Sequence, residues 1–151
     1  MNFDKEVAWA TGFFEGEGTV SVMKPRQRNW GSLCVSVVNT ERHLVEFFQS
    51  RWGGRIREMK MSGNRKRAWR WTLSSRQAAK YLADIQPYVF GQRMKDRVFL
   101  GLAFQDNKWS MNRHVSEAER EDYWKANVWY WRQFYHLNRR GLCSDAPSFR
   151  K

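Results

Sequence analysis

Two glutamates that alternate with glycines are the residues of this chain best suited to metal chemistry. Glu15, Gly16, Glu17 and Gly18 close a helix-like run that begins near Trp9. Because glycine has no Cβ, backbone and carboxylate can approach a phosphate or a metal ion closely there. Carboxylate oxygens are hard ligands of the kind that divalent cations prefer. The pattern favours a cation site, and its plainer alternative is a pair of solvated acids in a turn after an ordinary helix.

A large positive charge narrows the range of partners. The 151 residues include 27 Lys and Arg against 15 Asp and Glu, which gives a formal net charge of +12. Cations that neutralise phosphates release condensed counterions, so this surplus favours a nucleic acid. A membrane surface is the other anionic candidate, but no long apolar run or basic interfacial helix is present. We expect no membrane partner and no small-molecule substrate.

The cysteines and the first residues bear on location. Cys34 and Cys143 lie far apart in sequence, so neither a disulfide framework nor a zinc site is indicated. Residues 1–10 carry acids and lack the basic-then-apolar pattern of a secretion signal. We expect an intracellular protein, in the cytoplasm or nucleoid, with an organelle or a phage-infected host also possible.

The elements that must position the two acids alternate between helices and hairpins. Hydrophobic spacing and turn residues predict a helix from about Lys5 to Glu15, strands over 19–24 and 33–38, a helix that Gly53 and Gly54 end, strands over 55–61 and 68–73, a helix to about Ile85, and a further apolar segment over 89–104. Expected helix caps are Asp4, Thr40, Ser74 with Gln77, and Ser116 with Glu119. A last helix is predicted from the stripe of Trp124, Val128, Trp131 and Tyr135.

This order predicts an α+β fold in which helices pack on one face of an antiparallel sheet. The strands alternate, so one side of each should join the core and the other should be polar. In the second hairpin, Trp69, Trp71 and Leu73 share one side, and Arg70 and Thr72 share the other. We interpret the polar side as a surface that reads a ligand, and most of the nine tryptophans as core residues rather than base-stacking platforms.

With motif and element order together, the chain resembles the LAGLIDADG homing endonucleases. Residues 10–18, A-T-G-F-F-E-G-E-G, resemble the nine-residue signature of that family, and the resemblance covers about residues 1–105. It implies an α-β-β-α-β-β-α saddle, with residues 106–151 as a C-terminal helical extension of the same domain. Since one motif is present, it also implies a homodimer whose motif helices meet along small residues. The interface residues expected on this basis are Ala8, Thr11, Gly12 and Glu15.

The resemblance further implies a site-specific enzyme that makes a double-strand break in a long, pseudo-palindromic DNA site. Glu17 would bind Mg²⁺ or Mn²⁺ beside the Gly16 carbonyl, with Ca²⁺ as a substitute that does not support cleavage. Asn39 would order water in the catalytic pocket. The family often has a lysine where this chain has Gln92, and Arg93 or Lys95 are the candidates to replace it.

DNA recognition in this family uses the two hairpins in the major groove, where Arg suits guanine and Asn or Gln suits adenine. The DNA-binding residues expected here are Ser21, Lys24, Arg26, Gln27, Arg28, Asn29, Trp30, Ser36, Arg55, Arg57, Arg65, Lys66, Arg67, Arg70 and Thr72. The main alternative is a DNA-binding regulator or RNA-splicing maturase that no longer cuts, which the glutamine at position 92 favours. A basic RNA-binding structural protein is a third reading.

Overall fold

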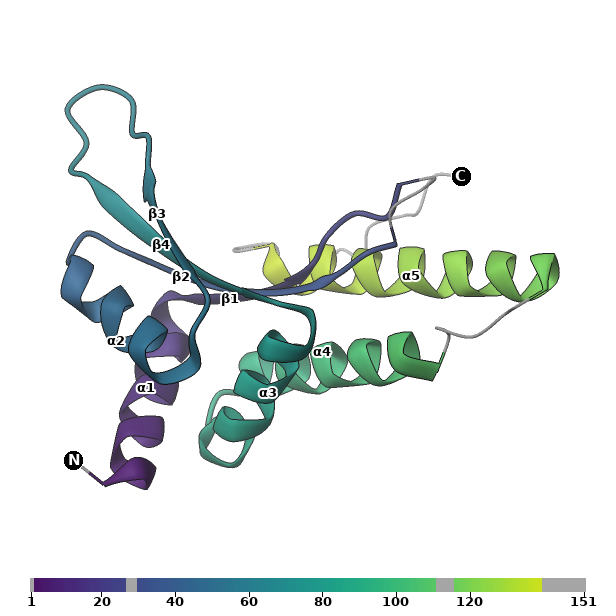
Figure 1. The fold of residues 1–151 in the computed structure, drawn as a ribbon, viewed down its shortest axis with the longest axis horizontal. Helices are drawn as coiled ribbons and strands as arrows, with labels where there is room; N and C mark the ends of the chain where they lie inside the picture. The colour runs from purple at the N-terminus through teal and green to yellow at the C-terminus, as the bar shows by residue number, and fades with distance from the viewer. Residues whose placement is uncertain (1, 27–29, 111–115, 140–151) are drawn as a thin grey trace.

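The computed structural model describes residues 2–26, 30–110 and 116–139 and has the α+β architecture expected from the sequence. In chain order the elements are α1 (Phe3–Glu17), β1 (Gly18–Val22), β2 (Leu33–Asn39), α2 (Arg42–Trp52), β3 (Arg55–Met59), β4 (Ala68–Ser74), α3 (Ser75–Ile85), the short 3₁₀ helix η1 (Gln86–Tyr88), α4 (Gln92–Ser110) and α5 (Glu117–Asn138). Figure 1 shows α1 to α4 gathered beneath the sheet, with the β3–β4 hairpin rising away from them. None of the described helices is long and apolar enough to cross a membrane.

The four strands form one antiparallel sheet in the order β1-β2-β4-β3. Each predicted hairpin forms, and the two hairpins join through β2 and β4 at the centre, where Val35 pairs with Leu73 and Val37 pairs with Trp71. Partners that lie directly opposite in an antiparallel pair point to the same side of the sheet. This register therefore places Val20, Val35, Val37, Ile56, Trp71 and Leu73 on one side of the sheet.

An aromatic cluster around Trp71 fills the space between the sheet and the helices. Trp71 is fully buried, and its ring packs against Phe48 of α2 and Tyr81 of α3, with centroids 5.0 and 5.3 Å away. Its indole N–H donates to the Gly53 carbonyl at 2.7 Å, so the one polar atom of the ring is satisfied. The interpretation of Trp71 as a core residue is confirmed.

The helix caps agree with the sequence only in part. Ser116 and Glu119 form the predicted capping box, with both reciprocal bonds present. The side chain of Asn2, not Asp4, caps α1, and the Ser74 side chain makes no capping bond to α3. Thr40 does not cap α2 either: the cap position is Glu41, which has no side-chain capping bond. The predictions of Asp4 and Thr40 were wrong, whereas Ser74 stands at the predicted N-cap position of α3 without the capping bond.

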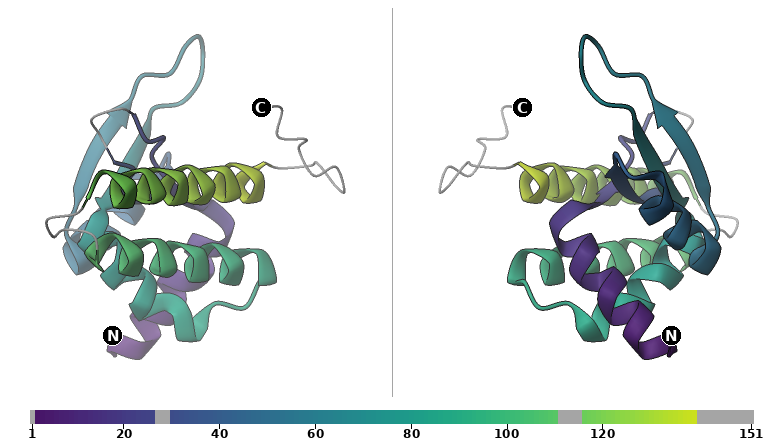
Figure 2. Two further views of the ribbon diagram at one scale, coloured as in Figure 1. Left: turned by 90° about the vertical axis from the view of Figure 1, so that its right-hand side faces the viewer. Right: turned by 90° about the vertical axis from the view of Figure 1, so that its left-hand side faces the viewer.

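The last helix packs along β1 and α4, and Phe134 joins the same buried cluster as α1 and the sheet. Asn127 and Phe134 are its buried residues. The buried side of α5 is therefore rotated about the helix axis relative to the predicted stripe, whose member Tyr135 is 53% exposed. Figure 2 shows α5 running alongside α4, stacked against it in both views.

Two glycines with left-handed backbones provide a matched test of this packing. Gly54 has φ +90°, and a Cβ on it would lie 2.5 Å from the Thr72 carbonyl oxygen, whereas Gly63 has φ +71° with nothing within 4 Å. We expect Gly54→Ala to lower the free energy of unfolding by roughly 2–4 kcal/mol, because a backbone clash adds to the strain. Gly63→Ala should cost only about 1 kcal/mol. Urea denaturation of both variants measures this, and equal losses would contradict the packing at Gly54.

Candidate nucleic-acid interface and metal site

The last turn of α1 carries both glutamates and passes directly into β1. Gly18 is buried at this junction, and a Cβ on it would overlap the ring of Phe14. This glycine is therefore explained by close packing of an aromatic ring. The expectation that Gly18 also gives a ligand close approach stays a prediction. Gly16 is different, since it is exposed and a Cβ there would meet nothing within 4 Å.

Glu15 connects the motif helix to the start of α4. Its carboxylate accepts the backbone N–H of Gly91 at 2.6 Å and that of Phe90 at 3.1 Å. The Gly91 carbonyl in turn accepts the N–H groups of Met94 and Lys95, so Gly91 lies at the N-terminal end of α4. A carboxylate is favourable there, because the first N–H groups of a helix lack partners and carry partial positive charge. Glu15 thus has a structural role in holding two helices together.

Glu17 is exposed, and within the described part of the chain no ion pair engages its carboxylate. A hard divalent cation would find there the Glu17 oxygens and the Gly16 carbonyl, which is a suitable donor set for Mg²⁺. The described residues contain no group of three or more His, Cys, Asp or Glu that could hold a metal by themselves. The donors fit an ion that takes its remaining ligands from water and a phosphate.

Asn39 lies at the same end of the sheet as the two acids. It stands two residues beyond Val37, which pairs with Gly18. Its side-chain Oδ1 accepts the backbone N–H of Glu41 at 2.8 Å, in the turn that leads into α2. That bond occupies the carbonyl oxygen and leaves the amide NH₂ as the group that Asn39 could offer to water.

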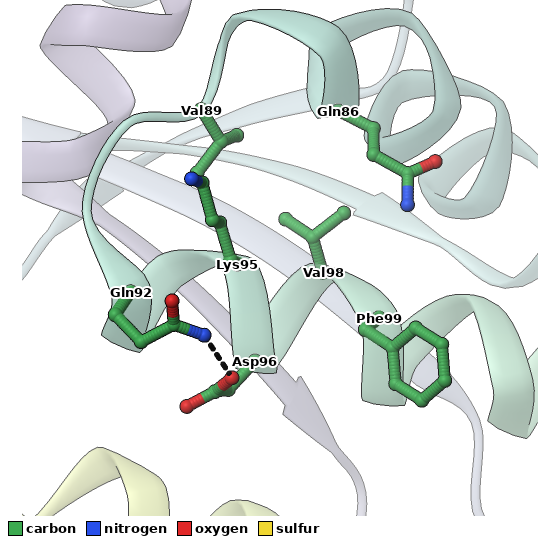
Figure 3. Close-up of a pocket in the computed structure, with 7 residues that line it drawn as sticks. All are labelled: Gln86, Val89, Gln92, Lys95, Asp96, Val98 and Phe99. Atoms are coloured by element: carbon green, nitrogen blue, oxygen red, sulfur yellow. Dashed lines mark hydrogen bonds between the residues drawn. The ribbon is translucent and has the colours of Figure 1, made fainter.

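The residues at the start of α4 divide into two groups. Gln92 follows Gly91, so the contact with Glu15 brings it near the last turn of α1, and its amide donates to Asp96 at 2.8 Å. Lys95 lines a cavity of about 330 Å³ with Gln92 and Asp96, and Figure 3 shows its side chain extending toward Val89. These two residues stay candidates for the catalytic pocket.

Arg93 points elsewhere. Its guanidinium donates to the carbonyls of Leu137 and Arg139, 3.0 and 2.5 Å away, at the C-terminal end of α5. A cation is favourable at this end of a helix, where the last carbonyls lack intrahelical partners. These bonds give Arg93 a structural role, and its role as the replacement for a catalytic lysine stays a prediction.

The side of the sheet away from the helices is polar and basic. Arg55 pairs with Thr72, Arg57 with Arg70, and Thr72 in turn with Ser36, so all five side chains lie on this side. Ser21 joins them through its partner Cys34. A hollow of about 680 Å³ lies over this face, lined by Met23, Gly54, Arg55, Arg57, Arg70, Thr72, Ser74 and Gln77.

We call the residues Ser21, Ser36, Arg55, Arg57, Arg70 and Thr72 the open face. All six were predicted as DNA-binding residues, and the structure brings them together on one surface. Sequence reasoning missed Ser74 and Gln77, because it used both for a helix cap. Strand alternation carried the signal for Ser74, two residues after Thr72. Cys34 also lies on this side, where burial raises the pKa of its thiol and the charge of Arg70 partly offsets the rise.

The residues between the strands have varied surroundings. Arg65, Lys66 and Arg67 are exposed, and Arg67 pairs with Glu58 at 3.1 Å. Lys24 lies over the Trp131 ring, Arg26 is exposed, and Trp30 packs against α5. Gln27, Arg28 and Asn29 lie outside the described residues.

The residues expected at the interface between two motif helices differ in exposure. Ala8 and Gly12 are exposed on one side of α1 together with Gly16. Thr11 is 1% exposed, and its hydroxyl donates to the Val7 carbonyl at 2.7 Å. Thr11 was therefore wrongly expected at an interface, because its side chain is already enclosed within this chain.

Similarity to known proteins is visible in structure and not in sequence. No protein-family model matches the chain, and no curated protein matches it in sequence. Solved structures do match. The homing endonuclease I-CvuI in complex with the I-CreI target has a TM-score of 0.71 at 14% identity, over 95% of this chain and 89% of that one.

Two further matches have the same architecture. The archaeal intron-encoded homing endonuclease I-Vdi141I, complexed with DNA, has a TM-score of 0.71 at 16% identity, over 96% of this chain and 91% of that one. The LAGLIDADG homing endonuclease I-SmaMI, bound to cleaved DNA, has a TM-score of 0.63 at 18% identity, over 95% of this chain and 45% of that one. This chain therefore has the fold of the LAGLIDADG homing endonucleases.

Proposed function

We propose that this protein is a site-specific DNA endonuclease that hydrolyses phosphodiester bonds with a divalent metal and acts as a homodimer. The observation that carries the proposal is the position of Glu17. This exposed carboxylate ends α1 at the point where the chain enters the sheet whose open face carries Arg55, Arg57 and Arg70. An acid with cation-binding chemistry thus adjoins a surface suited to phosphates and bases.

Metal binding is assigned to Glu17 and the Gly16 carbonyl, with Mg²⁺ or Mn²⁺ as the cofactor. A metal bound in such a site supplies an activated water and stabilises the departing 3′ oxygen. The residues of this chain position the metal through α1, which Glu15 fixes against the start of α4. Asn39, Gln92 and Lys95 are the polar side chains assigned to water and phosphate around it.

DNA binding is assigned to the open face and the hairpin loops. A duplex is held largely through phosphate contacts, while base edges in the major groove are read by groups such as Arg and Ser. Arg55, Arg57 and Arg70 supply both kinds of contact, and a net charge of +12 strengthens attraction to DNA. A homodimer would repeat this surface and match a long, pseudo-palindromic site.

The glycines of α1 support a second copy of this chain as the partner. Glycine inside a helix costs about 0.5–1 kcal/mol relative to alanine. Neither Gly12 nor Gly16 has a neighbour within 4 Å that a Cβ would meet, so nothing within the described residues requires them. Close approach of another α1 helix would require them, because small residues allow helix backbones to come together.

Gln92 supports a second candidate function. The resemblance expects a lysine at this position, and here an amide bonded to Asp96 stands in its place. A protein without that cation could bind the same DNA as a regulator, or act as an RNA-splicing maturase, without cutting. Cleavage assays separate the two candidates.

Replacing Glu17 with neutral glutamine should affect cleavage, whereas the same replacement of Glu15 should affect stability. We expect Glu17→Gln to abolish Mg²⁺-dependent cleavage and to leave DNA affinity nearly unchanged. Glu15→Gln should instead lower the free energy of unfolding by roughly 1 kcal/mol, because charge-assisted bonds to two backbone N–H groups weaken. A randomised duplex library, incubated with Mg²⁺ or EDTA and sequenced at its ends, identifies the target and measures cleavage. Specific retention of DNA by the wild-type protein without any cutting would favour the regulator or maturase.

Substitution on the exposed side of α1 tests the dimer. Gly12→Arg should convert the protein to a folded monomer, because the side chain fills the space reserved for the partner helix. A Cβ at Gly12 meets nothing within 4 Å, the position is exposed, and arginine is a better helix former than glycine. Sedimentation velocity measures the mass, and Ala83→Arg, on an exposed position of α3, is the control that should stay dimeric. An unchanged dimer in Gly12→Arg would place the interface elsewhere.

Removing one arginine from the open face should reduce the salt dependence of DNA binding. We expect Arg70→Ala to weaken binding and to lower the slope of log K against log salt by about 1. Arg42→Ala removes the same charge from α2, among the helices beneath the sheet, and should leave that slope unchanged. Fluorescence anisotropy at several salt concentrations makes the comparison. Equal effects of the two variants would show that the open face does not contact the duplex.

A further inference from the structure

The two hairpins of the sheet differ in how they are supported. Residues 60–67, between β3 and β4, are all exposed, and Figure 1 shows this hairpin extending away from every described helix. The β1–β2 hairpin instead extends along α5. Contacts with α4 and α5 hold it at several separate points.

Aromatic rings form the first group of contacts. Trp30 lies in the connection between β1 and β2, and its ring packs on Tyr123 and Trp124 with centroids 4.6 and 6.1 Å away. Lys24 lies in the same connection, with Nζ 5.0 Å from the centroid of the Trp131 ring. Ring pairs and cation–π contacts each favour one relative position of their partners.

Side chains from the helices also bind backbone carbonyls of the hairpin. Asn138 donates to the Val20 carbonyl at 2.8 Å, and Lys108 donates to the Gly31 carbonyl at 3.2 Å. β1 is an edge strand, whose outward carbonyls find no strand partner. Burial lowers the pKa of Lys108, which is the expected effect of holding an ammonium group between a helix and a loop.

Gly31 allows these elements to meet. It is buried, and a Cβ there would lie 2.8 Å from the Met23 carbonyl oxygen and 3.4 Å from Asn127 Oδ1. Asn127 is itself 1% exposed and comes from the middle of α5. The hairpin connection and the helix are therefore packed closely, with no room for a side chain at this point.

We propose that α5 is a brace that fixes the β1–β2 hairpin, and that Tyr123, Trp124 and Trp131 are positioning residues for sequence recognition by that hairpin. The proposal rests on the DNA-binding function proposed above. It changes the role of two residues first expected to contact DNA. Trp30 and Lys24 anchor the hairpin to α5, which leaves exposed neighbours such as Arg26 to face the duplex.

The first test needs no DNA. Amide hydrogen exchange at Met23, whose N–H bonds the Ser32 carbonyl, reports opening of the hairpin. Tyr123→Leu should speed this exchange by roughly 3- to 10-fold, since one ring contact is lost. The conservative Tyr123→Phe should restore the wild-type rate, and Trp129→Leu, at a 52% exposed position of α5, is the matched control. If Tyr123→Leu destabilises the whole fold, Trp30→Leu removes the same contact from the exposed partner. Exchange no faster than in the control would overturn the brace.

The second test measures sequence preference on the cleavage or binding target. Tyr123→Leu and Trp131→Leu should relax preference by about 3- to 10-fold only at the bases read by the first hairpin, and not at the bases that Arg55 and Arg57 read. An equal loss at every position would overturn the role in recognition. If the wild-type protein binds no specific DNA while Met23 exchange still accelerates, the proposed function fails and the brace alone is supported.

Discussion

Strand alternation, fixed in register by the pairing of β2 with β4, is the constraint on which the rest of this structure depends. Because side chains alternate sides along a strand, Val35, Val37 and Trp71 enter the core only if Ser36, Arg70 and Thr72 turn away from it. A slip of one residue would bury the arginine and expose the tryptophan. Burial of the apolar side chains therefore also determines which side chains form the open face. Contacts among the polar residues themselves are not needed to place them there.

Within three residues the motif helix carries Glu15, which has a structural role, and Glu17, for which a chemical role is proposed. The Glu15 carboxylate accepts the N–H groups at the start of α4, whereas the Glu17 carboxylate is exposed at the surface. Gly18 allows the ring of Phe14 to close over the junction, so the helix ends sharply and the strand begins at once. The position of the exposed acid relative to the sheet is thus set by packing within the chain, before any partner, metal or nucleic acid is bound.

Much of the fold follows from local patterns, and the errors have two sources: competing local interpretations, and contacts between distant parts of the chain. The hairpins and helices follow from hydrophobic spacing, and Ser116 with Glu119 forms the expected box because that helix start is solvated. Ser74 is the last residue of β4 and also stands at the N-cap position of α3, but its side chain makes no capping bond and instead lines the hollow. The roles of Arg93 and Trp30 depend on contacts with α5, between residues far apart in sequence that no local spacing reveals. Thr11 is enclosed because of the side of α1 that packs on the rest of the chain.

The free β3–β4 loop has a consequence for how such a protein could change over time. Its residues 60–67 are exposed, and the pair of Arg67 with Glu58 is a surface contact of little energetic weight. Substitutions and changes of length in such a loop leave the core untouched. Under the proposed function, new target preferences would accumulate in this half of the surface at almost no cost to folding, while the half tied to α5 would change little.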